Sequence, residues 1–508
     1  MGLVFYMCFS VLPFIKSVGG KTQNSSRKKK RLLTMVDFNK TAHSDSTASN
    51  SHPTKLLLIL AVFFLGQALQ YSNGFLSAAG IFFLTISLTL IILSVTAKKS
   101  PEKAFITDRI HILIILGFIW QVFQLLTQPP GIARLEDKLD QLWIFQLLII
   151  LSGFFALTSL IPLKQISQRI QRFAVFLTFI TFLGAGIWII KAYPNPQIDV
   201  FRFQQTSSKA LLQGKNPYEQ PIPNIYGPGT SLYGEKLIEG DHLNVSNPYP
   251  PLSIYVSTLG YIVGKDIRYS HLAAILLVAI LIIIINPNRD SLLISYLFLF
   301  TPRVFFVLEQ SWTEPIVLLF TIIAIWSALK KSKWLPYALG LMIASKQYYV
   351  FIIPFLYFLI PTKTNWRKWI KPSATLIATG LIVTAFLALW NIPAFLWNVG
   401  IFQWYQPFRV DSLSFATLYV LFFQQYPPGY LSFAALFIAF LFAKHYLTPS
   451  AENFALAISL GLGIFFAFNK QAFCNYYYLF LGSLAVAAAV LPAFSSTDNS
   501  APPTAQST

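Results

Sequence analysis

The sequence has little charge and almost no cysteine. Only 11% of its 508 residues are charged and 55% are hydrophobic, whereas soluble domains carry about 25% charged residues. This composition excludes an ordinary soluble protein and indicates a chain embedded in a membrane. The two cysteines, Cys8 and Cys474, lie far apart without a CxxC motif or a Cys/His cluster, so neither a disulfide framework nor a zinc site is supported.

Nucleotide-binding motifs are also missing. There is no Walker motif and no GxGxxG after a strand pattern, so nucleotide hydrolysis and a nucleotide-sugar site in a soluble domain are unsupported. The net charge of +19 is explained best by cytoplasmic loops that follow the positive-inside rule. The run Arg27–Arg31 suits anionic lipid headgroups at least as well as nucleic acid, so we expect membrane lipids and no nucleic acid as partners.

Long apolar runs recur along the chain. Judged against the roughly 20 residues that a spanning helix needs, they predict an all-α polytopic membrane protein with about 12–14 transmembrane helices. The short stretches 335–345 and 347–361 are expected to be half-helices that meet at the membrane face around Lys346. The apolar stretches are 56–71, 76–97, 110–127, 141–162, 173–191, 271–286, 290–302, 314–330, 335–345, 347–361, 373–390, 429–443, 452–469 and 473–492.

Polar segments divide the chain, and their charges predict its orientation. Met35 is a second candidate for the start of translation. The side that holds both tails carries 25 of the 38 basic and 7 of the 19 acidic residues, a charge of +18 against +1 on the other side. This asymmetry predicts cytoplasmic termini. The expected regions are disordered cytoplasmic tails at 1–54 and 493–508, N-terminal transmembrane helices at 55–191, a large external loop with interfacial helices after the fifth span at 192–270, and C-terminal transmembrane helices at 271–492.

The external loop begins with an aspartate at the start of an expected short helix. This helix runs from Asp199 to Leu212 with apolar residues near helical spacing, which is typical of a helix that lies along a membrane surface. Asp199 is a candidate general base, and the alternative is that it simply caps the helix. The apolar segment Tyr249–Gly264 is kept on the outer side as a re-entrant or interface-lying segment, because a crossing there would make the basic loops after it external.

Polar residues interrupt three apolar stretches on the side that carries Asp199. Ionisable residues at membrane depth are costly, so each is a candidate site residue, although a lone lysine that snorkels to the interface explains Lys346 or Lys470 equally well. A carboxylate can take the proton of an acceptor hydroxyl while a cation stabilises a departing phosphate. The interrupting residues are Glu309, Gln310, Glu314, Lys346, Gln347, Asn469, Lys470, Gln471, Asn475 and Tyr476.

Four segments carry a resemblance to a known family. Asp199–Phe203, Ala210–Tyr218, Tyr249–Leu252 and Gly340–Gln347 resemble the C-type membrane glycosyltransferases, and in particular the bacterial polyprenyl-phosphate-mannose-dependent mannosyltransferases. The likeness covers about residues 190–490. It implies that the external loop is catalytic, that Asp199 is the base and that the donor is a polyprenyl-phosphate sugar.

The sequence departs from this family in two ways. Five spans precede Asp199, whereas many members place the loop directly after their first span. Many relatives also have a second acid two residues after the first, but here that residue is Phe201, which puts a metal-binding role in doubt and leaves the cofactor unassigned. Asp241 could supply a second carboxylate, although a solvated turn acid is the favoured interpretation.

The resulting hypothesis is an inverting glycosyltransferase, since a single displacement needs one base. A hexose, with mannose as one candidate, would pass from the polyprenyl-phosphate donor to a lipid or glycan acceptor at the outer face. The alternatives are a transporter or lipid flippase, and a non-catalytic envelope-assembly protein. The predicted site comprises Asp199 as base, Lys346, Lys470 and Arg202 at the donor phosphate, and Tyr218, Asn216, Gln310, Glu314, Gln347, Asn475 and Asp241 at the substrates.

Overall fold

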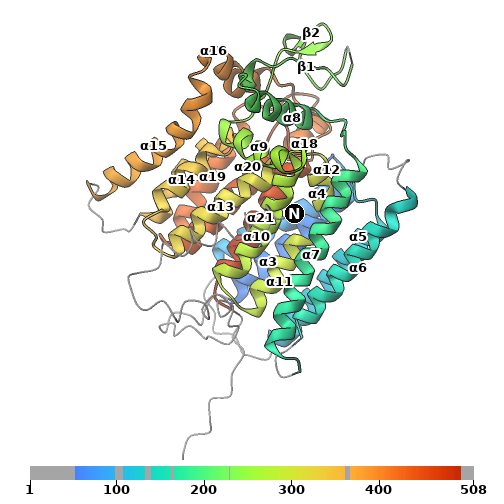
Figure 1. Cartoon of the computed structure of the whole chain (residues 1–508). Coiled ribbons are helices and arrows are strands. Elements are labelled where there is room, and N and C mark those ends of the chain that lie inside the picture. Colours follow the sequence, from blue (N-terminus) through green and yellow to red (C-terminus); the bar gives the residue numbers. More distant parts are fainter. Residues whose placement is uncertain are drawn as a thin grey trace, which may run out of the picture.

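The protein is a bundle of helices with a smaller cap at one end (Figure 1). The computed structural model describes residues 52–97, 107–131, 139–161, 165–227, 229–360 and 367–493. Before the cap, the chain forms α3 (His52–Ser72), α4 (Ala78–Thr96), α5 (Thr107–Thr127), the 3-10 turn η3 (Leu139–Gln141), α6 (Leu142–Ser159) and α7 (Gln168–Ala192). After it come α10 (Arg268–Ile285), α11 (Arg289–Leu299), α12 (Val304–Glu309), α13 (Glu314–Leu329), α14 (Leu335–Ala344), the 3-10 helix η6 (Gln347–Leu359), α15 (Arg367–Ala388), α19 (Leu431–Tyr446), α20 (Ala451–Ala467) and α21 (Cys474–Val490).

The helices have the length and composition of a membrane protein. Within the described ranges, seven helices are long and apolar enough to cross a membrane, namely α3, α4, α5, α6, α7, α10 and α15. Seven more apolar helices have only 10–17 residues. The chain is therefore an all-α membrane protein, as its composition predicts, and the count of about 12–14 spans stays a prediction because it depends on these shorter helices.

The core lies around α20 and α21. These two helices bury side chains around most of their circumference, whereas Leu387 is the only buried residue of the peripheral helix α15, all of which the structure describes. At Gly340 the backbones of α14 and α15 come so close that a Cβ would lie 2.6 Å from the carbonyl oxygen of Leu376. Glycine is thus required where these two helices cross, because any larger residue would push them apart.

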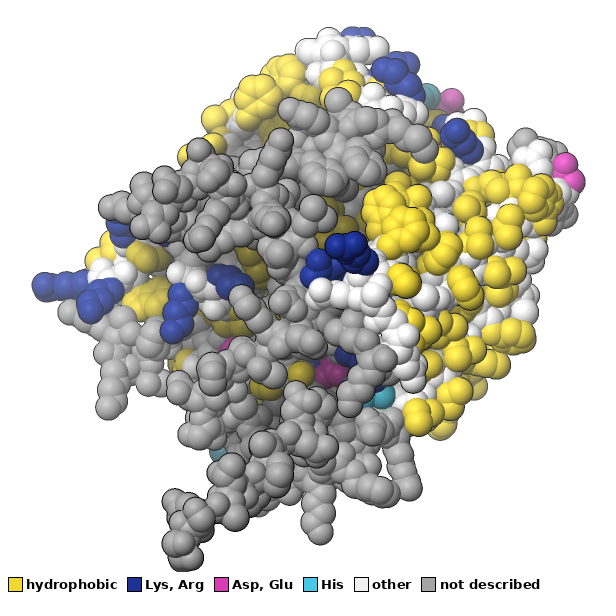
Figure 2. All heavy atoms as spheres, turned by 60° about the horizontal axis from the view of Figure 1, so that its bottom comes forward, with side chains coloured by type: hydrophobic (Ala, Val, Ile, Leu, Met, Phe, Trp, Pro, Cys, Tyr) yellow, Lys and Arg dark blue, Asp and Glu magenta, His cyan; other side chains and the backbone are white. Residues whose placement is uncertain are grey.

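The end of the bundle opposite the cap is basic at its rim and has a buried charged cluster. Figure 2 shows this end, with Lys and Arg side chains on its surface and hydrophobic side chains covering the flank where α5 and α6 lie. Lys55 donates to the Asp290 carboxylate at 2.9 Å, and His111 contacts the same carboxylate at 2.7 Å. Because these residues begin α3, α11 and α5, the cluster joins three helix ends.

The cap combines two segments that are distant in sequence. The first contains α8 (Asp199–Leu212), the 3-10 turn η4 (Pro217–Glu219), β1 (Ile222–Pro223), the 3-10 turn η5 (Glu235–Leu237), β2 (Ile238–Glu239), β3 (His242–Leu243) and α9 (Pro251–Gly264). The second contains α16 (Ile392–Phe395), the π-helix η7 (Leu396–Ile401), α17 (Phe402–Tyr405) and α18 (Phe415–Phe423). The strands form a small antiparallel sheet in the order β1-β3-β2, in which Pro223 faces His242.

A small apolar core holds the two cap segments together. Phe402 of the second segment packs with Phe203, Tyr233 and Leu243 of the first. The sequence analysis expected no strands in the external loop and assigned no part of the site to residues 389–430. Both differences arise because these short elements are stabilised by packing on one another rather than by long apolar runs of their own.

The two irregular segments singled out in the sequence have defined structures. The helix α14 ends at Ala344 and η6 begins at Gln347, so the backbone breaks at Lys346, which adopts an extended conformation. The segment Tyr249–Gly264 becomes α9, a 14-residue helix that begins at Pro251 and packs against α8 and α10. The predicted tails at 1–54 and 493–508 fall almost entirely outside the described residues.

Candidate functional site

Asp199 is the first residue of α8 rather than its cap. The capping position is taken by Ile198, which has extended backbone angles and offers no side-chain cap. The Asp199 Oδ1 accepts a hydrogen bond of 2.7 Å from the backbone N–H of Val200, the residue directly after it. Only one carboxylate oxygen of Asp199 therefore binds the backbone at the start of the helix. The other oxygen contacts a different part of the cap.

Two tyrosines from the loop after β1 hold Asp199. The hydroxyl of Tyr233 donates to Asp199 Oδ2, and the hydroxyl of Tyr226 accepts from the Asp199 backbone N–H at 3.3 Å. Burial raises the pKa of the Asp199 carboxyl above its usual range, and the hydrogen bonds from Tyr233 and Val200 only partly oppose this rise. A carboxylate with a raised pKa is a stronger base, which is what proton removal from a hydroxyl requires.

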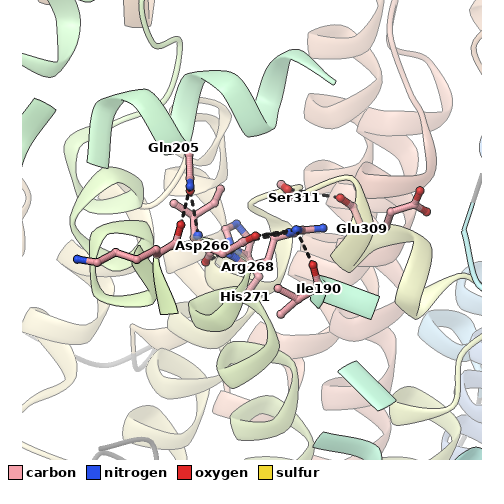
Figure 3. A network of polar contacts seen from close by, with 9 residues as sticks. Ile190, Gln205, Asp266, Arg268, His271, Glu309 and Ser311 are labelled. Carbon is pink, nitrogen blue, oxygen red and sulfur yellow. Dashed lines mark hydrogen bonds and ion pairs between the residues drawn. The ribbon is translucent and has the colours of Figure 1, made fainter. Parts of the chain in front are cut away.

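The helix α8 is fixed to the bundle by a buried polar network (Figure 3). Arg268, at the start of α10, pairs with Asp266 at 2.6 Å and donates to the Ile190 carbonyl at the end of α7. Its guanidinium also lies 5.3 Å from the ring centroid of Phe201 on α8. Gln205 of α8 completes the network, since its amide donates to the Lys265 carbonyl at 2.7 Å and accepts from the Ile267 N–H.

A second group of polar residues lies where α13, α21 and the break before η6 meet. The Lys346 ammonium donates to Glu314 Oε1 at 2.9 Å and to Thr313 Oγ1 at 2.8 Å. Asn475 Nδ2 donates to the same Glu314 oxygen at 3.0 Å. We call Glu314, Lys346 and Asn475 the inner polar cluster. The structure thus brings together three residues that were predicted as site residues from separate segments of the sequence.

Tyr249 connects Asp199 with the inner polar cluster. The Lys346 ammonium lies 4.4 Å from the centroid of the Tyr249 ring. Burial raises the pKa of the Tyr249 hydroxyl strongly, and the charges of Glu314 and Asp199 both add to the rise. The Tyr249 hydroxyl is thus within electrostatic range of both Asp199 and the inner polar cluster.

Two of the predicted substrate-binding residues support Tyr249 instead. The Tyr218 hydroxyl donates to the Tyr249 carbonyl at 2.8 Å, and Asn216 Oδ1 accepts from the Tyr218 N–H at 3.0 Å. Gln347 donates to the carbonyl of Pro248 at 3.2 Å. Because the Tyr218 hydroxyl and the Asn216 amide oxygen both bind within the cap, these two residues hold the loop that carries Tyr249.

Arg409 is the cation whose charge acts on the Asp199 carboxylate. It lowers the pKa of Asp199 and of Tyr226 relative to what burial alone would give. The Arg409 guanidinium donates two hydrogen bonds to the Asp411 carboxylate, at 2.8 and 2.6 Å, and lies 4.6 Å from the Phe473 ring centroid. The sequence analysis missed Arg409, for which the only local signal is an Arg-x-Asp spacing beside aromatic residues.

Lys470 lies next to Arg409 but donates to the protein itself. Its carbonyl accepts from the Arg409 N–H at 3.0 Å, while its ammonium donates to the carbonyls of Gln403 and Gln406 at 3.1 and 2.7 Å. Burial lowers the pKa of this ammonium. Lys470 therefore helps to fix the segment that carries Arg409.

The remaining predicted residues lie in different surroundings. Arg202 is half-buried on α8, and its Nε has no hydrogen-bond partner among the described residues. Gln310 is buried at the end of α12. The Asp241 side chain is 90% exposed and contacts His242, which agrees with a solvated turn acid.

The donor set offers little to a metal ion. Among the residues that the structure describes, no group of three or more His, Cys, Asp or Glu side chains is arranged to hold one. The groups that the structure places in this region are one half-buried carboxylate, the Arg409 guanidinium, a buried ion pair and several tyrosines. No protein-family model, no curated protein and no solved structure matches this chain.

Proposed function

We propose that this protein is a membrane glycosyltransferase that uses a polyprenyl-phosphate sugar. It would transfer a hexose, with mannose as one candidate, to a lipid or glycan acceptor at the outer face of a bacterial inner membrane. The observation that carries the proposal is the environment of Asp199, the first residue of an amphipathic helix in the cap. Its carboxylate accepts hydrogen bonds from the Val200 N–H and the Tyr233 hydroxyl, and the charge of Arg409 acts on it. That pairing suits proton removal next to a departing phosphate.

The proposed reaction is one displacement at the sugar C1. The acceptor hydroxyl oxygen forms a bond to C1 while its proton passes to the Asp199 carboxylate. The bond from C1 to the phosphate oxygen breaks, and its electron pair leaves with the polyprenyl phosphate. Attack opposite the leaving group inverts C1, and only one carboxylate is needed.

The phosphate would be neutralised chiefly by Arg409. Arg409 and Lys346 are both paired with a carboxylate, but the Arg409–Asp411 pair is partly exposed whereas the Lys346–Glu314 pair is buried. The Lys470 ammonium is engaged with two backbone carbonyls. Arg202, three residues after Asp199 on the same helix, is a second candidate because residues three apart share a helix face. Lys346 and Lys470 thus have less support as phosphate ligands than the sequence alone suggested.

Asp199→Asn tests the proposal. Loss of the base should lower transfer from a radiolabelled polyprenyl-phosphate hexose by about 10²- to 10⁴-fold. The matched control is Asp241→Asn, which removes an exposed acid from the same external segment and should leave transfer unchanged. The melting temperature of the Asp199 variant should not fall at neutral pH, because burial already disfavours the charged form. Transfer at the rate of the unmodified protein would remove Asp199 from the role of base.

A transporter or flippase is the second candidate, favoured by the buried pair of Glu314 and Lys346. Ion pairs between apolar helices also mark translocation pathways. A transporter would move a labelled lipid or sugar across proteoliposome membranes while the label stayed on its original carrier. Under the glycosyltransferase proposal the label changes carrier.

A further inference from the structure

The inner polar cluster is buried and has no net charge. The exposed fractions of the Glu314 and Lys346 side chains are 1% and 4%, and their ammonium and carboxylate are 2.9 Å apart. Asn475, also buried, adds a neutral amide. A phosphate that entered this cluster would meet a cation already paired with a carboxylate, so the cluster is a poor anion site.

Polar atoms in and around this cluster are nevertheless left without partners. Glu314 Oε2, the Tyr348 hydroxyl and Gln347 Oε1 are buried, and none has a hydrogen-bond partner within the described part of the chain. A buried polar atom without a partner costs about 1–3 kcal/mol, so such a group in a native protein calls for an explanation. Three of them around one ion pair indicate a place built to bind a polar ligand.

Aromatic rings surround the same place. Tyr348 and Tyr476 have ring centroids 6.0 Å apart, and the Lys346 ammonium lies 4.4 Å from the Tyr249 ring and 5.8 Å from the Tyr348 ring. Glu314 acts electrostatically on the hydroxyls of all three tyrosines. Neutral hydroxyl-rich rings are bound in proteins by this combination of flat apolar faces with well-placed polar groups.

We propose that the inner polar cluster binds the hydroxyls of the donor sugar, and that this sugar is an uncharged hexose. The inference rests on the proposed function and divides the site into two parts. The phosphate lies at Arg409 beside Asp199, and the sugar extends from it past Tyr249 to Glu314, Lys346 and Asn475. An acidic sugar would bring an unbalanced charge into a buried neutral cluster, so the cluster selects against it.

The test compares the binding of three ligands to the purified full-length protein in nanodiscs. The ligands are polyprenyl phosphate, its neutral hexose derivative and its uronic acid derivative. The unmodified protein should bind the hexose derivative at least about tenfold more tightly than the uronic acid derivative, since an uncompensated buried charge is costly.

Asn475→Leu and Tyr348→Phe then probe the cluster itself. Each should weaken binding of the hexose derivative by about tenfold, the size expected for one hydrogen bond, and leave polyprenyl phosphate unaffected. Tyr348→Phe removes only a hydroxyl that has no hydrogen-bond partner among the described residues, so it keeps the test valid if Asn475→Leu does not fold. The control is Asn195→Leu, the same exchange at an exposed residue of the external segment.

The outcomes separate this inference from the proposed function. If the unmodified protein binds none of the three ligands, both are wrong. A variant that weakens the binding of polyprenyl phosphate and of its hexose derivative equally would show that the inner polar cluster is structural. Equal binding of the hexose and uronic acid derivatives by the unmodified protein would likewise contradict the sugar assignment, and in both cases the proposed function stands. Selective loss of the hexose derivative supports the sugar assignment.

Discussion

The chemical character of Asp199 depends on the groups that its two carboxylate oxygens contact. One oxygen is held by the helix backbone and the other by the Tyr233 hydroxyl, while burial works against the charged form. The result is a base that still binds a proton at a pH where an exposed aspartate would be fully ionised. Its protonation should therefore be visible in the pH dependence of the reaction.

Tyr233→Phe should move the acidic limb of the pH profile of kcat/KM to higher pH. The Tyr233 hydrogen bond stabilises the ionised carboxylate and so lowers the pKa of Asp199. Losing it raises that pKa further, so the carboxylate is protonated earlier as the pH falls. Tyr430→Phe, at an exposed tyrosine, should leave the profile unchanged. A limb that stays in place would show that it does not report Asp199.

At the scale of single elements, the position of α8 depends on residues of its neighbours. The helix carries the base at its first residue, yet Gln205 and Phe201 attach it to the loop before α10 and to Arg268. The Arg268 side chain is fully buried and its partner Asp266 nearly so. Breaking such a pair leaves one buried charge alone, which costs more than the intact pair contributes.

Arg268→Met should therefore destabilise the protein by about 3–5 kcal/mol and lower transfer through displacement of α8. Adding Asp266→Asn should recover part of that loss, because the isolated carboxylate is then neutral. The measurement is thermal unfolding of the detergent-solubilised variants. Equal stability of the single and double variants would contradict a role for the ion pair.

At the scale of the whole molecule, charge predicts how the bundle sits in the membrane. The cap lies at one end of the bundle, and exposed Lys and Arg side chains gather at the other end (Figure 2). Lys333, at the junction of α13 and α14, and Arg367 and Lys368, at the start of α15, are exposed. If the positive-inside rule applies, the cap faces outward.

Cysteine accessibility tests this orientation. In a variant without Cys8 and Cys474, a cysteine that replaces Asp241 should react with a membrane-impermeant maleimide in intact cells. A cysteine that replaces Lys333 should react only after permeabilisation. Both original side chains are exposed, so burial does not explain a difference. The reverse pattern would place the cap in the cytoplasm.

The sequence allowed some features to be predicted because their signals are local. Low charge and long apolar runs were sufficient for an all-α membrane protein, and an amphipathic segment that starts at an aspartate was sufficient for α8. The pairing of Glu314 with Lys346 joins the start of α13 to the backbone break before η6, 32 positions later, which no local pattern specifies. Arg409 is linked to Asp199 only through the packing of one cap segment on the other, so its role required the fold.

The buried contacts of Lys55 have a consequence for how the chain is made. Lys55 meets Asp290, 235 residues later, and the Pro492 carbonyl, 437 residues later. During synthesis, the first described helix therefore enters the membrane long before these two partners have been translated. The helix α3 can therefore reach its final buried environment only after α21 and Pro492 have been translated.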